Sequence, residues 1–522
     1  MTELPKLPLG SQSFETLRAF DEAYVDKTRM IGGLARARAR VFLARPRRFG
    51  KSLLVSTFAS LFEHGLRDFQ GLEIEKHWSD KTYDVVKLDF SNLANFRTAA
   101  EFASGLRKKL KLAFEPIGLV LSADEERFEK ELAAGLSKLE RSSVVLLIDE
   151  YDAPLIFATA DDALFSGVEE ALKRFFDILK VNEGAFRFCF VTGVTRYGCA
   201  RIFNAFEPTD ISFEPEYGTL LGYTEDELLR NFGDHLKKAS ASLGVSMEML
   251  LKDMRKCYAG FSFDRECRTH VYCPWSVLNF LQSETHAFEN HWFSSAGLPD
   301  VLVRHLSAKK PEAFLKPVRT SAGRLFLSAP DHNPNVLLQQ TGCLTIRSVD
   351  EAGNLELGYP NREVESSMAQ LYSCAMVHDE DFMADDVLNA LCEGNADAVV
   401  HSLNQLLSAL DYTHFPVGDE AGFRGVLQIV MHGFSIRSPV EVRSGPERGD
   451  LEVEAGLFRW VFECKFARTG ADAKALCSEA VEQIRKRDYG NTPHGKALIR
   501  VGMVFNEEQR RITDWRTAVD AR

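Results

Sequence analysis

The feature that most constrains this chain is a Gly-Lys-Ser tripeptide, Gly50 to Ser52, which stands between two apolar segments of different period. Residues 40–44 (RVFLA) form a short apolar run typical of a buried strand, and the apolar residues after Ser52 recur at helical spacing. A strand, a tight loop and a helix in this order place backbone N–H groups at a helix N-terminus, where anions are stabilised. The segment therefore predicts a loop that binds phosphate.

Residues 45–52 fit the phosphate-loop pattern GxxxxGK[ST] except at its first position, where Arg45 replaces glycine. In such a loop the lysine contacts the outer phosphates and the hydroxyl binds Mg²⁺. Arginine cannot adopt every backbone conformation open to glycine, so this loop is expected to differ in shape. The residues predicted to contact ATP are Arg47, Arg48, Phe49, Gly50, Lys51 and Ser52, with Ser52 also a metal ligand.

A second apolar run, residues 146–150 (LLIDE), ends in two acids. We expect Asp149 to hold Mg²⁺ and Glu150 to polarise the attacking water as general base. Two acids at a strand end are often merely solvated, but the phosphate-loop pattern upstream favours the catalytic interpretation. The pair therefore strengthens the prediction of an ATPase.

The next strand carries Thr192 and Thr195 at its end. A polar residue there can sense the γ-phosphate, which is the role predicted for Thr192. The alternative, a hydroxyl satisfied by nearby backbone, stays open. Arg196 and Arg201 are candidates for an arginine supplied to a neighbouring subunit, so a homo-oligomer is expected.

Strand-like runs alternate with helical segments through the first 222 residues. Such alternation predicts an α/β domain with a parallel sheet covered by helices on both faces. Beyond Gly222 the pattern becomes helical, and Thr224 with Glu227 has the spacing of a capping box. We therefore expect three parts: an ATPase domain at 1–222, a mainly helical lid or linker at 223–360, and an α/β domain at 361–522.

The third part carries Asp450 and then Glu463-Cys464-Lys465 on an apolar strand. This spacing fits the PD-(D/E)xK core, in which two carboxylates hold Mg²⁺ beside a scissile phosphate. Strand alternation puts Glu463 and Lys465 on one face. The lysine can then position water or stabilise the charged transition state. A solvated hairpin is the alternative, but the order helix, strands, helix, strand favours a metal-dependent nuclease.

A third metal ligand is expected upstream. Glu420, at the start of a helical segment, is the candidate, and Glu441 is its rival. Gln483 lies in the helix that follows the Glu-x-Lys strand, and Tyr489 lies just beyond it. Mn²⁺ is an alternative ion for this site.

Composition and sequence patterns restrict where in the cell we expect this protein to act. No run of about 18 uncharged apolar residues exists, so no membrane span is expected. The N-terminus lacks a secretory pattern, and the ten cysteines show no CxxC pair, so a cytoplasmic protein with reduced thiols is expected. The net charge of −12 argues only weakly against nucleic-acid binding, because phosphate contacts are local.

The chain resembles the bacterial and archaeal AAA-ATPase-like family with a fused PD-(D/E)xK nuclease domain. The family's own phosphate loop begins with arginine, so Arg45 fits it. Three places depart from the family pattern: Cys273 stands where asparagine is usual, Arg448-Gly449-Asp450 rearranges a GRxD motif, and Cys464 stands where phenylalanine is common. The segments that carry the resemblance are residues 24–28, 45–52, 148–154, 192–195, 222–224, 272–277 and 357–361.

The resemblance implies a P-loop NTPase sheet, a restriction-endonuclease-like α/β domain, and both activities on one chain. The leading hypothesis is that the ATP state controls cleavage of nucleic acid, with DNA the expected substrate and defence against foreign DNA a role by analogy. The rival is a nucleotide-gated switch or scaffold whose C-terminal fold binds nucleic acid without cutting it. Trp275 and Trp292 are expected to be core residues rather than platforms for bases.

Overall fold

The computed structural model describes residues 4–122, 125–292, 314, 316–327, 333–377, 384–434, 441–443, 450–489 and 495–518. The chain forms two compact units. The first consists of Met1–His286 and Val318–Pro360, and the second of Ala287–Pro317 and Asn361–Arg522. The residues expected to form a separate middle region therefore belong mainly to the first unit.

A five-stranded parallel sheet forms the centre of the first unit. Its strands lie in the order β2-β3-β4-β1-β5. All six residues of β3 are buried, as expected for a central strand with helices on both faces. The strands are β1 (Arg40–Ala44), β2 (Asp84–Asp89), β3 (Val144–Asp149), β4 (Phe186–Gly193) and β5 (Thr209–Asp210).

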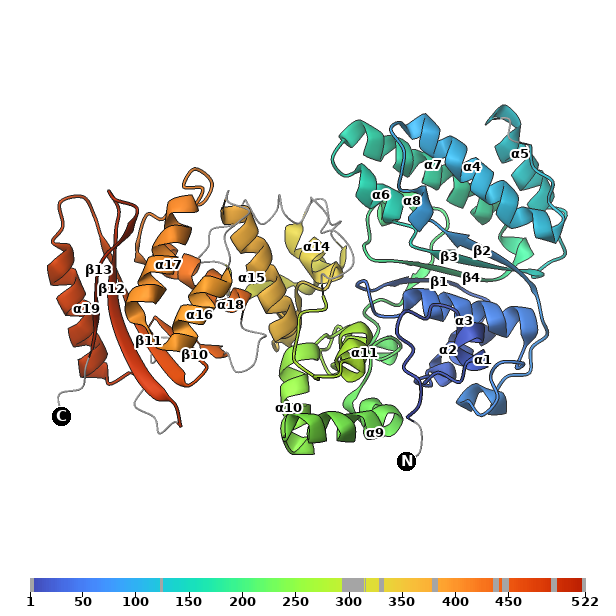
Figure 1. The fold of residues 1–522 in the computed structure, drawn as a ribbon. Coiled ribbons are helices and arrows are strands. Elements are labelled where there is room, and N and C mark those ends of the chain that lie inside the picture. Colours follow the sequence, from blue (N-terminus) through green and yellow to red (C-terminus); the bar gives the residue numbers. More distant parts are fainter. Residues whose placement is uncertain are drawn as a thin grey trace. The chain divides into compact units, whose positions relative to one another are not determined.

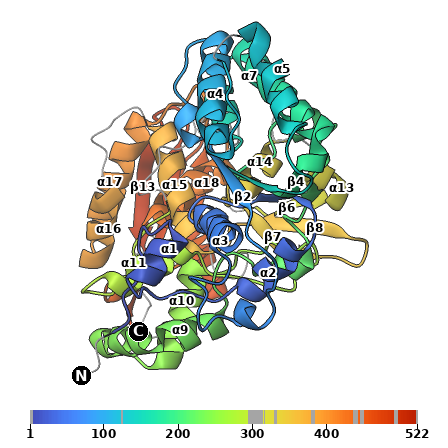
Figure 2. The same cartoon turned by 90° about the vertical axis from the view of Figure 1, so that its right-hand side faces the viewer.

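Helices cover both faces of this sheet, and the two views show them as separate layers (Figures 1 and 2). One layer contains α1 (Phe14–Ala19), α2 (Thr28–Arg36) and α3 (Lys51–His64). The other contains α4 (Ala99–Phe114), α5 (Glu125–Leu136), α6 (Ala153–Ala158), α7 (Asp162–Val181) and α8 (Cys199–Ile202). The predicted α/β fold of the N-terminal part is confirmed.

The rest of the first unit consists mainly of helices, with three short strands among them. Helix α9 (Glu225–Leu243) begins with the predicted capping box between Thr224 and Glu227. A three-stranded antiparallel sheet of order β6-β8-β7 also forms here, which the sequence did not predict. The elements are α10 (Met247–Tyr258), α11 (Pro274–Gln282), β6 (Val318–Ser321), α13 (Ala322–Leu327), α14 (Pro334–Gln340), β7 (Thr345–Val349) and β8 (Asn354–Gly358).

The second unit contains a five-stranded mixed sheet of order β13-β12-β11-β10-β9. Strand β11 pairs antiparallel with β10 and parallel with β12. The strands of this mixed sheet are β9 (Glu441–Arg443), β10 (Leu451–Ala455), β11 (Phe458–Ala467), β12 (Ala497–Asn506) and β13 (Arg511–Thr517). The predicted order of helix, strands, helix and strand is confirmed, and β13 extends it.

Helices flank this second sheet (Figure 1). Helix α19 (Ala473–Arg487) packs on β11 and β12, where Gly502 leaves room for Ala480 and Val481. Helix α18 (Glu420–Gly433) packs on β10 and β11. The remaining helices are α15 (Arg362–Met376), α16 (Ala384–Glu393) and α17 (Ala396–Ala409). No helix within the described ranges is long and apolar enough to cross a membrane.

Candidate nucleotide and metal sites

The phosphate-loop segment forms a tight turn between β1 and α3. Gly50 has φ of 92° and caps the N-terminus of α3, and Arg48 also has a positive φ of 72°. A Cβ added at Gly50 would meet no atom within 4 Å, so the positive φ rather than crowding favours glycine at this position. This geometry presents backbone N–H groups to an anion, as the sequence predicts.

Lys51 is turned back onto its own loop. Its ammonium Nζ donates to the carbonyl oxygens of Arg45 and Pro46, at 3.1 Å each, and its side chain is buried. Burial lowers the pKa of Lys51, while Glu150 and Asp149 oppose that shift. The amine therefore makes contacts within the loop that the phosphates of a nucleotide could replace.

Arg45, at the position of the first pattern glycine, points into the protein interior. Its guanidinium donates to the carbonyls of Ala44 and Tyr217, at 3.0 and 3.1 Å, and lies 4.4 Å from the ring centroid of Phe263. Burial lowers the pKa of Arg45 to about 9. The arginine thus anchors the base of the loop.

Asp149 and Glu150 follow β3 as predicted. The Asp149 carboxylate accepts a hydrogen bond from the Glu150 backbone N–H at 3.0 Å, and the nearby Ser52 hydroxyl opposes the rise of its pKa. The two predicted Mg²⁺ ligands, Ser52 and Asp149, therefore lie near each other. Burial raises the pKa of both acids, and Glu150 adopts a positive φ of 49°. These oxygens are the donor type that Mg²⁺ prefers, so the residues fit a nucleotide-bound Mg²⁺.

The two threonines at the end of β4, Thr192 within the strand and Thr195 just beyond it, make hydrogen bonds within the protein. The Thr192 hydroxyl is fully buried and donates to the Leu43 carbonyl at 2.7 Å. The backbone alternative thus describes Thr192, and we leave it out of the proposed nucleotide site. Thr195 donates through both its N–H and its hydroxyl to Asp152, each at 2.6 Å.

Asp152 belongs to the segment of residues 148–154, but the sequence pattern assigns no role to it. It is buried and also accepts from the Val194 N–H at 3.1 Å, so it ties the turn after β3 to the end of β4. Among the candidate arginines, Arg196 forms an ion pair with Asp210 at 3.0 Å, whereas Arg201 is 59% exposed and pairs with Glu169.

The aromatic segment around Trp275 reaches the phosphate loop. The Arg48 guanidinium lies 4.1 Å from the Trp275 ring centroid, and Phe49 packs on Phe261 and Phe263 at 5.0 Å each. Because the Phe49 side chain is buried, only its backbone remains for phosphate. Trp275 is partly buried beside the loop, a placement that the expected core role did not anticipate.

The second candidate site gathers predicted nuclease residues from four places. Glu420 begins α18, Asp450 precedes β10, Glu463 and Lys465 lie on β11, and Gln483 lies on α19. The Lys465 ammonium is 3.3 Å from Glu463 Oε1 and 3.9 Å from Glu420 Oε2, and it donates to Gln483 Oε1 at 3.0 Å. Lysine, two glutamates and glutamine therefore meet at one point.

Asp450 reaches the same region from the other side. One carboxylate oxygen accepts from the Cys464 backbone N–H at 2.8 Å, and the other pairs with the Arg424 guanidinium at 2.8 Å. Sequence reasoning missed Arg424, although its spacing of four residues from Glu420 puts both on one helix face. Tyr489 instead packs in a core cluster with Val461 and Ile484.

The electrostatics of this site reflect crowded acids. Burial and the charge of Asp450 raise the pKa of Glu463 to about 7, and burial also raises the pKa of Glu420. Glu420 and Glu463 hold the pKa of Lys465 above its usual value, against the effect of burial. A divalent cation would relieve this excess of negative charge, and oxygen donors suit Mg²⁺ or Mn²⁺. The donor set therefore fits a metal.

The candidate carboxylates are not drawn together as ligands around an ion. In the described parts of the chain, only Glu15, Glu63 and His64 bring three metal-ligating atoms within 4.8 Å of one another. Cations separate the acids of the nuclease site instead. Glu441 lies on β9, but its side chain is outside the described residues, as are Arg448 and Gly449.

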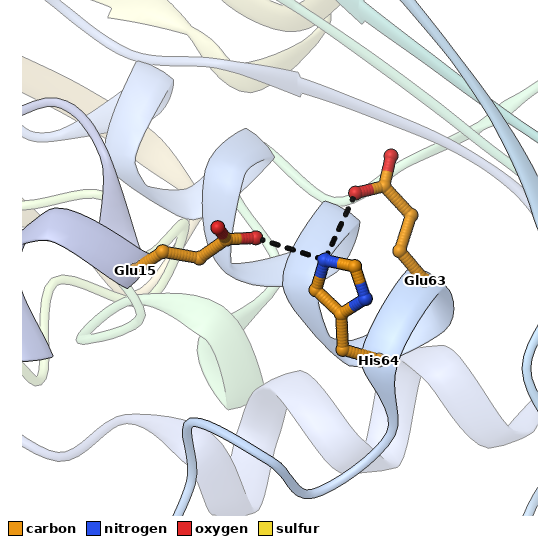
Figure 3. A group of neighbouring side chains, drawn as sticks. All are labelled: Glu15, Glu63 and His64. Atoms are coloured by element: carbon orange, nitrogen blue, oxygen red, sulfur yellow. Dashed lines mark ion pairs between the residues drawn. The ribbon is translucent and has the colours of Figure 1, made fainter. Parts of the chain in front are cut away.

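The cluster of Glu15, Glu63 and His64 has a simpler explanation than a metal. His64 Nε2 lies 3.2 Å from Glu15 and 3.7 Å from Glu63 (Figure 3). Arg67 also pairs with Glu15 at 3.4 Å, and Lys87 pairs with Glu63 at 3.5 Å. All three members are partly exposed, and their ion pairs balance their charge, so we assign no ion to them.

Comparison with known proteins bears on both sites. Residues 8–203 match the family described as Predicted AAA-ATPase, and residues 419–515 match the PD-(D/E)XK nuclease superfamily. A protein of Azotobacter chroococcum mcd 1, described as an uncharacterized protein in vnfD 5'region, is 28% identical over 372 residues. That match covers 70% of this chain and 69% of the relative.

Among solved structures, the Aeropyrum pernix ORC2 protein in ADPNP–ADP complexes matches 70% of this chain and 97% of its own, at 11% identity and a TM-score of 0.26. A likeness at that score carries no argument about this protein. The two family matches confirm the resemblance that the sequence motifs carry. This chain therefore joins an AAA-ATPase-like domain at residues 8–203 to a PD-(D/E)XK nuclease superfamily domain at residues 419–515.

Proposed function

We propose that this protein binds and hydrolyses ATP at the phosphate loop, cleaves nucleic acid at the C-terminal site with Mg²⁺, and couples the two. The observation that carries the proposal is the meeting of Lys465 with Glu463, Glu420 and Gln483. A lysine that is 12% exposed and stands among acids, near Asp450, suits metal-assisted phosphodiester hydrolysis. DNA is the proposed substrate, and defence against foreign DNA is the proposed role by analogy.

In the proposed cleavage, Asp450 and Glu463 would hold Mg²⁺, and Glu420 would complete the set of ligands. The ion would supply a Lewis acid for the scissile phosphate and lower the pKa of a bound water. Lys465 places its ammonium beside the reacting oxygens, where it orients the water or stabilises developing negative charge. Gln483 fixes the lysine through the 3.0 Å hydrogen bond.

In the proposed ATPase step, Lys51 exchanges the carbonyls of Arg45 and Pro46 for the outer phosphates. Ser52 and Asp149, which lie near each other, would hold Mg²⁺. Glu150 accepts a proton from the attacking water, and its raised pKa favours that transfer. Arg201, exposed on α8, is the proposed arginine for a neighbouring subunit of a homo-oligomer.

The test incubates the full chain with plasmid, linear and single-stranded DNA and with RNA, with Mg²⁺ or Mn²⁺, with and without ATP. Lys465→Ala should abolish cleavage and spare ATP hydrolysis. Lys51→Ala should abolish ATP hydrolysis and remove any effect of ATP on cleavage. Cleavage that persists in Lys465→Ala would show that the site is wrongly assigned.

The alternative is a nucleotide-gated switch whose C-terminal domain binds nucleic acid without cutting it. One observation favours it: Arg424 and Lys465 separate the three carboxylates. Nucleic-acid binding that depends on ATP, without cleavage in any lane, would support this alternative.

A further inference from the structure

Helix α18 presents two charged side chains to the candidate metal site. Asp419 caps the helix by accepting from the Gly422 N–H at 2.8 Å, which fixes the first turn. Glu420 and Arg424 are four residues apart, so they project from the same face. Glu420 reaches toward Lys465, and Arg424 reaches Asp450. The helix therefore delivers one acid and one fixed positive charge to the site.

The Asp450 carboxylate has both oxygens engaged. Its Oδ2 accepts from the Cys464 backbone N–H, and its Oδ1 pairs with Arg424 Nη1, each at 2.8 Å. The Cys464 contact belongs to the strand backbone of β11. The guanidinium is the exchangeable partner, because it sits at the end of a flexible side chain that is 36% exposed, whereas Asp450 is 11% exposed.

Arg424 differs from the other cation of the site. Lys465 is held by Glu463 and Gln483 and is 12% exposed, so it is fixed in place. The guanidinium of Arg424 stays charged at any relevant pH and has five N–H donors, which suit phosphate as well as carboxylate. An arginine of this kind can pass from a carboxylate to a phosphate without a change in protonation.

We propose that the Arg424 guanidinium is paired with the Asp450 carboxylate in the metal-free protein and that a divalent ion displaces the guanidinium from this carboxylate. The freed guanidinium then binds a backbone phosphate of the nucleic acid. The inference rests on the proposed nuclease function and adds a phosphate-binding residue to it. The exchange agrees with two observations: the Arg424 guanidinium holds Asp450 Oδ1 at 2.8 Å, and among the described residues the three acids do not bring their ligand atoms within 4.8 Å of one another. It also makes binding of metal and of nucleic acid mutually reinforcing.

The first experiment measures Mn²⁺ affinity of the full chain by electron paramagnetic resonance, without nucleotide or nucleic acid. Arg424→Met keeps the length of the side chain and removes its charge. We expect this variant to bind Mn²⁺ about fivefold more tightly than wild type, the size expected for a partly exposed pair. Arg468→Met, which removes an exposed arginine just beyond β11, is the matched control and should leave the affinity unchanged.

The sign of this change decides between two roles. If Arg424 merely holds Asp450 in position, Arg424→Met should weaken Mn²⁺ binding, and that result would overturn the proposal. Unchanged affinity would also overturn it. If wild type binds no Mn²⁺ at the C-terminal site, as judged with Asp450→Asn, the proposed nuclease function itself fails, which separates the two failures.

The second experiment measures binding of a fluorescent DNA duplex in EDTA and in Ca²⁺, a divalent ion that also takes oxygen ligands; the length of the duplex is checked after each run. We expect Arg424→Met to bind like wild type in EDTA, where Asp450 holds the guanidinium. In Ca²⁺ the wild type should gain affinity and the variant should lose most of that gain, while Arg424→Lys restores part of it. An equal gain in wild type and Arg424→Met would refute the contact with phosphate.

Discussion

Asp152 offers the sharpest structural prediction in the ATPase-like domain. Its buried carboxylate accepts from three donors: the N–H groups of Val194 and Thr195 and the Thr195 hydroxyl. Asp152→Ala removes the carboxylate that accepts these three hydrogen bonds, so all three donors lose this acceptor in a buried site. Each loss costs about 1–3 kcal/mol, and relaxation makes the sum smaller than three full terms. We therefore expect about 3–5 kcal/mol.

The loss should appear as faster local opening around residues 192–197, so amide hydrogen exchange followed by mass spectrometry is the suitable assay. Thr195→Val removes one of the three donors and should cost about 1–2 kcal/mol. Asp161→Ala is the matched control, because Asp161 is also an aspartate that accepts two backbone N–H bonds, but at the N-cap of α7.

That control should cost about 1 kcal/mol, confined to the start of α7. If Asp152→Ala opens the 192–197 segment by no more than Asp161→Ala opens its own helix, the three contacts do not stabilise this edge of the sheet. The reasoning that assigns Asp152 a structural role beside the nucleotide site would then be wrong.

Three further predictions concern other parts of the chain. The pKa of Glu463 is raised to about 7, so below that pH a metal ion must displace the proton of this carboxyl group before it can bind. The affinity for Mn²⁺ should therefore rise about tenfold from pH 6 to pH 8. Isothermal titration measures this change and should also show proton release on binding at pH 6. Arg45→Gly creates the full glycine pattern yet should destabilise the first unit by about 3 kcal/mol in urea unfolding and leave ATP affinity no higher, since it removes a buried, hydrogen-bonded side chain. Gly502→Val should loosen α19 by about 1–3 kcal/mol without changing ATP hydrolysis, because even a Cβ there would lie 3.0 Å from Ala480; unchanged exchange in α19 would contradict this packing.

The parts of the structure that could be predicted are those determined by residues close together in the sequence. The strands β1, β3 and β4 are short apolar runs between helical segments, and their buried positions follow from composition alone. The capping box of α9 is likewise encoded within four residues. The three-stranded sheet of β6, β7 and β8 was missed because its strands are short and mixed in polarity, as the half-exposed pattern of β6 shows.

Contacts between distant residues could not be read from the chain. The ion pair of Arg424 with Asp450 joins residues 26 apart, and no periodicity in either segment reveals it. Arg48 and Trp275 are in contact although they lie far apart in the sequence. The chemistry of Asp450, Glu463 and Lys465 was expected from their spacing. Their placement beside Arg424 depends on the packing of α18 against the sheet.

The division of the chain into two units bears on how its parts could have been inherited and how they can be separated. The polypeptide passes between the units at residues 286/287, 317/318 and 360/361, so no single cut or gene fusion point releases either one. A chain of residues 361–522 alone would lack the Asn290 side chain that accepts from Ser367 at 2.7 Å and the His291 N–H that donates to Glu363. It would also lose the ring contact of Phe314 with Tyr372, at 5.6 Å between centroids. A truncated gene for the nuclease-like part would therefore have to keep Asn290, His291 and Phe314 if these contacts are to form.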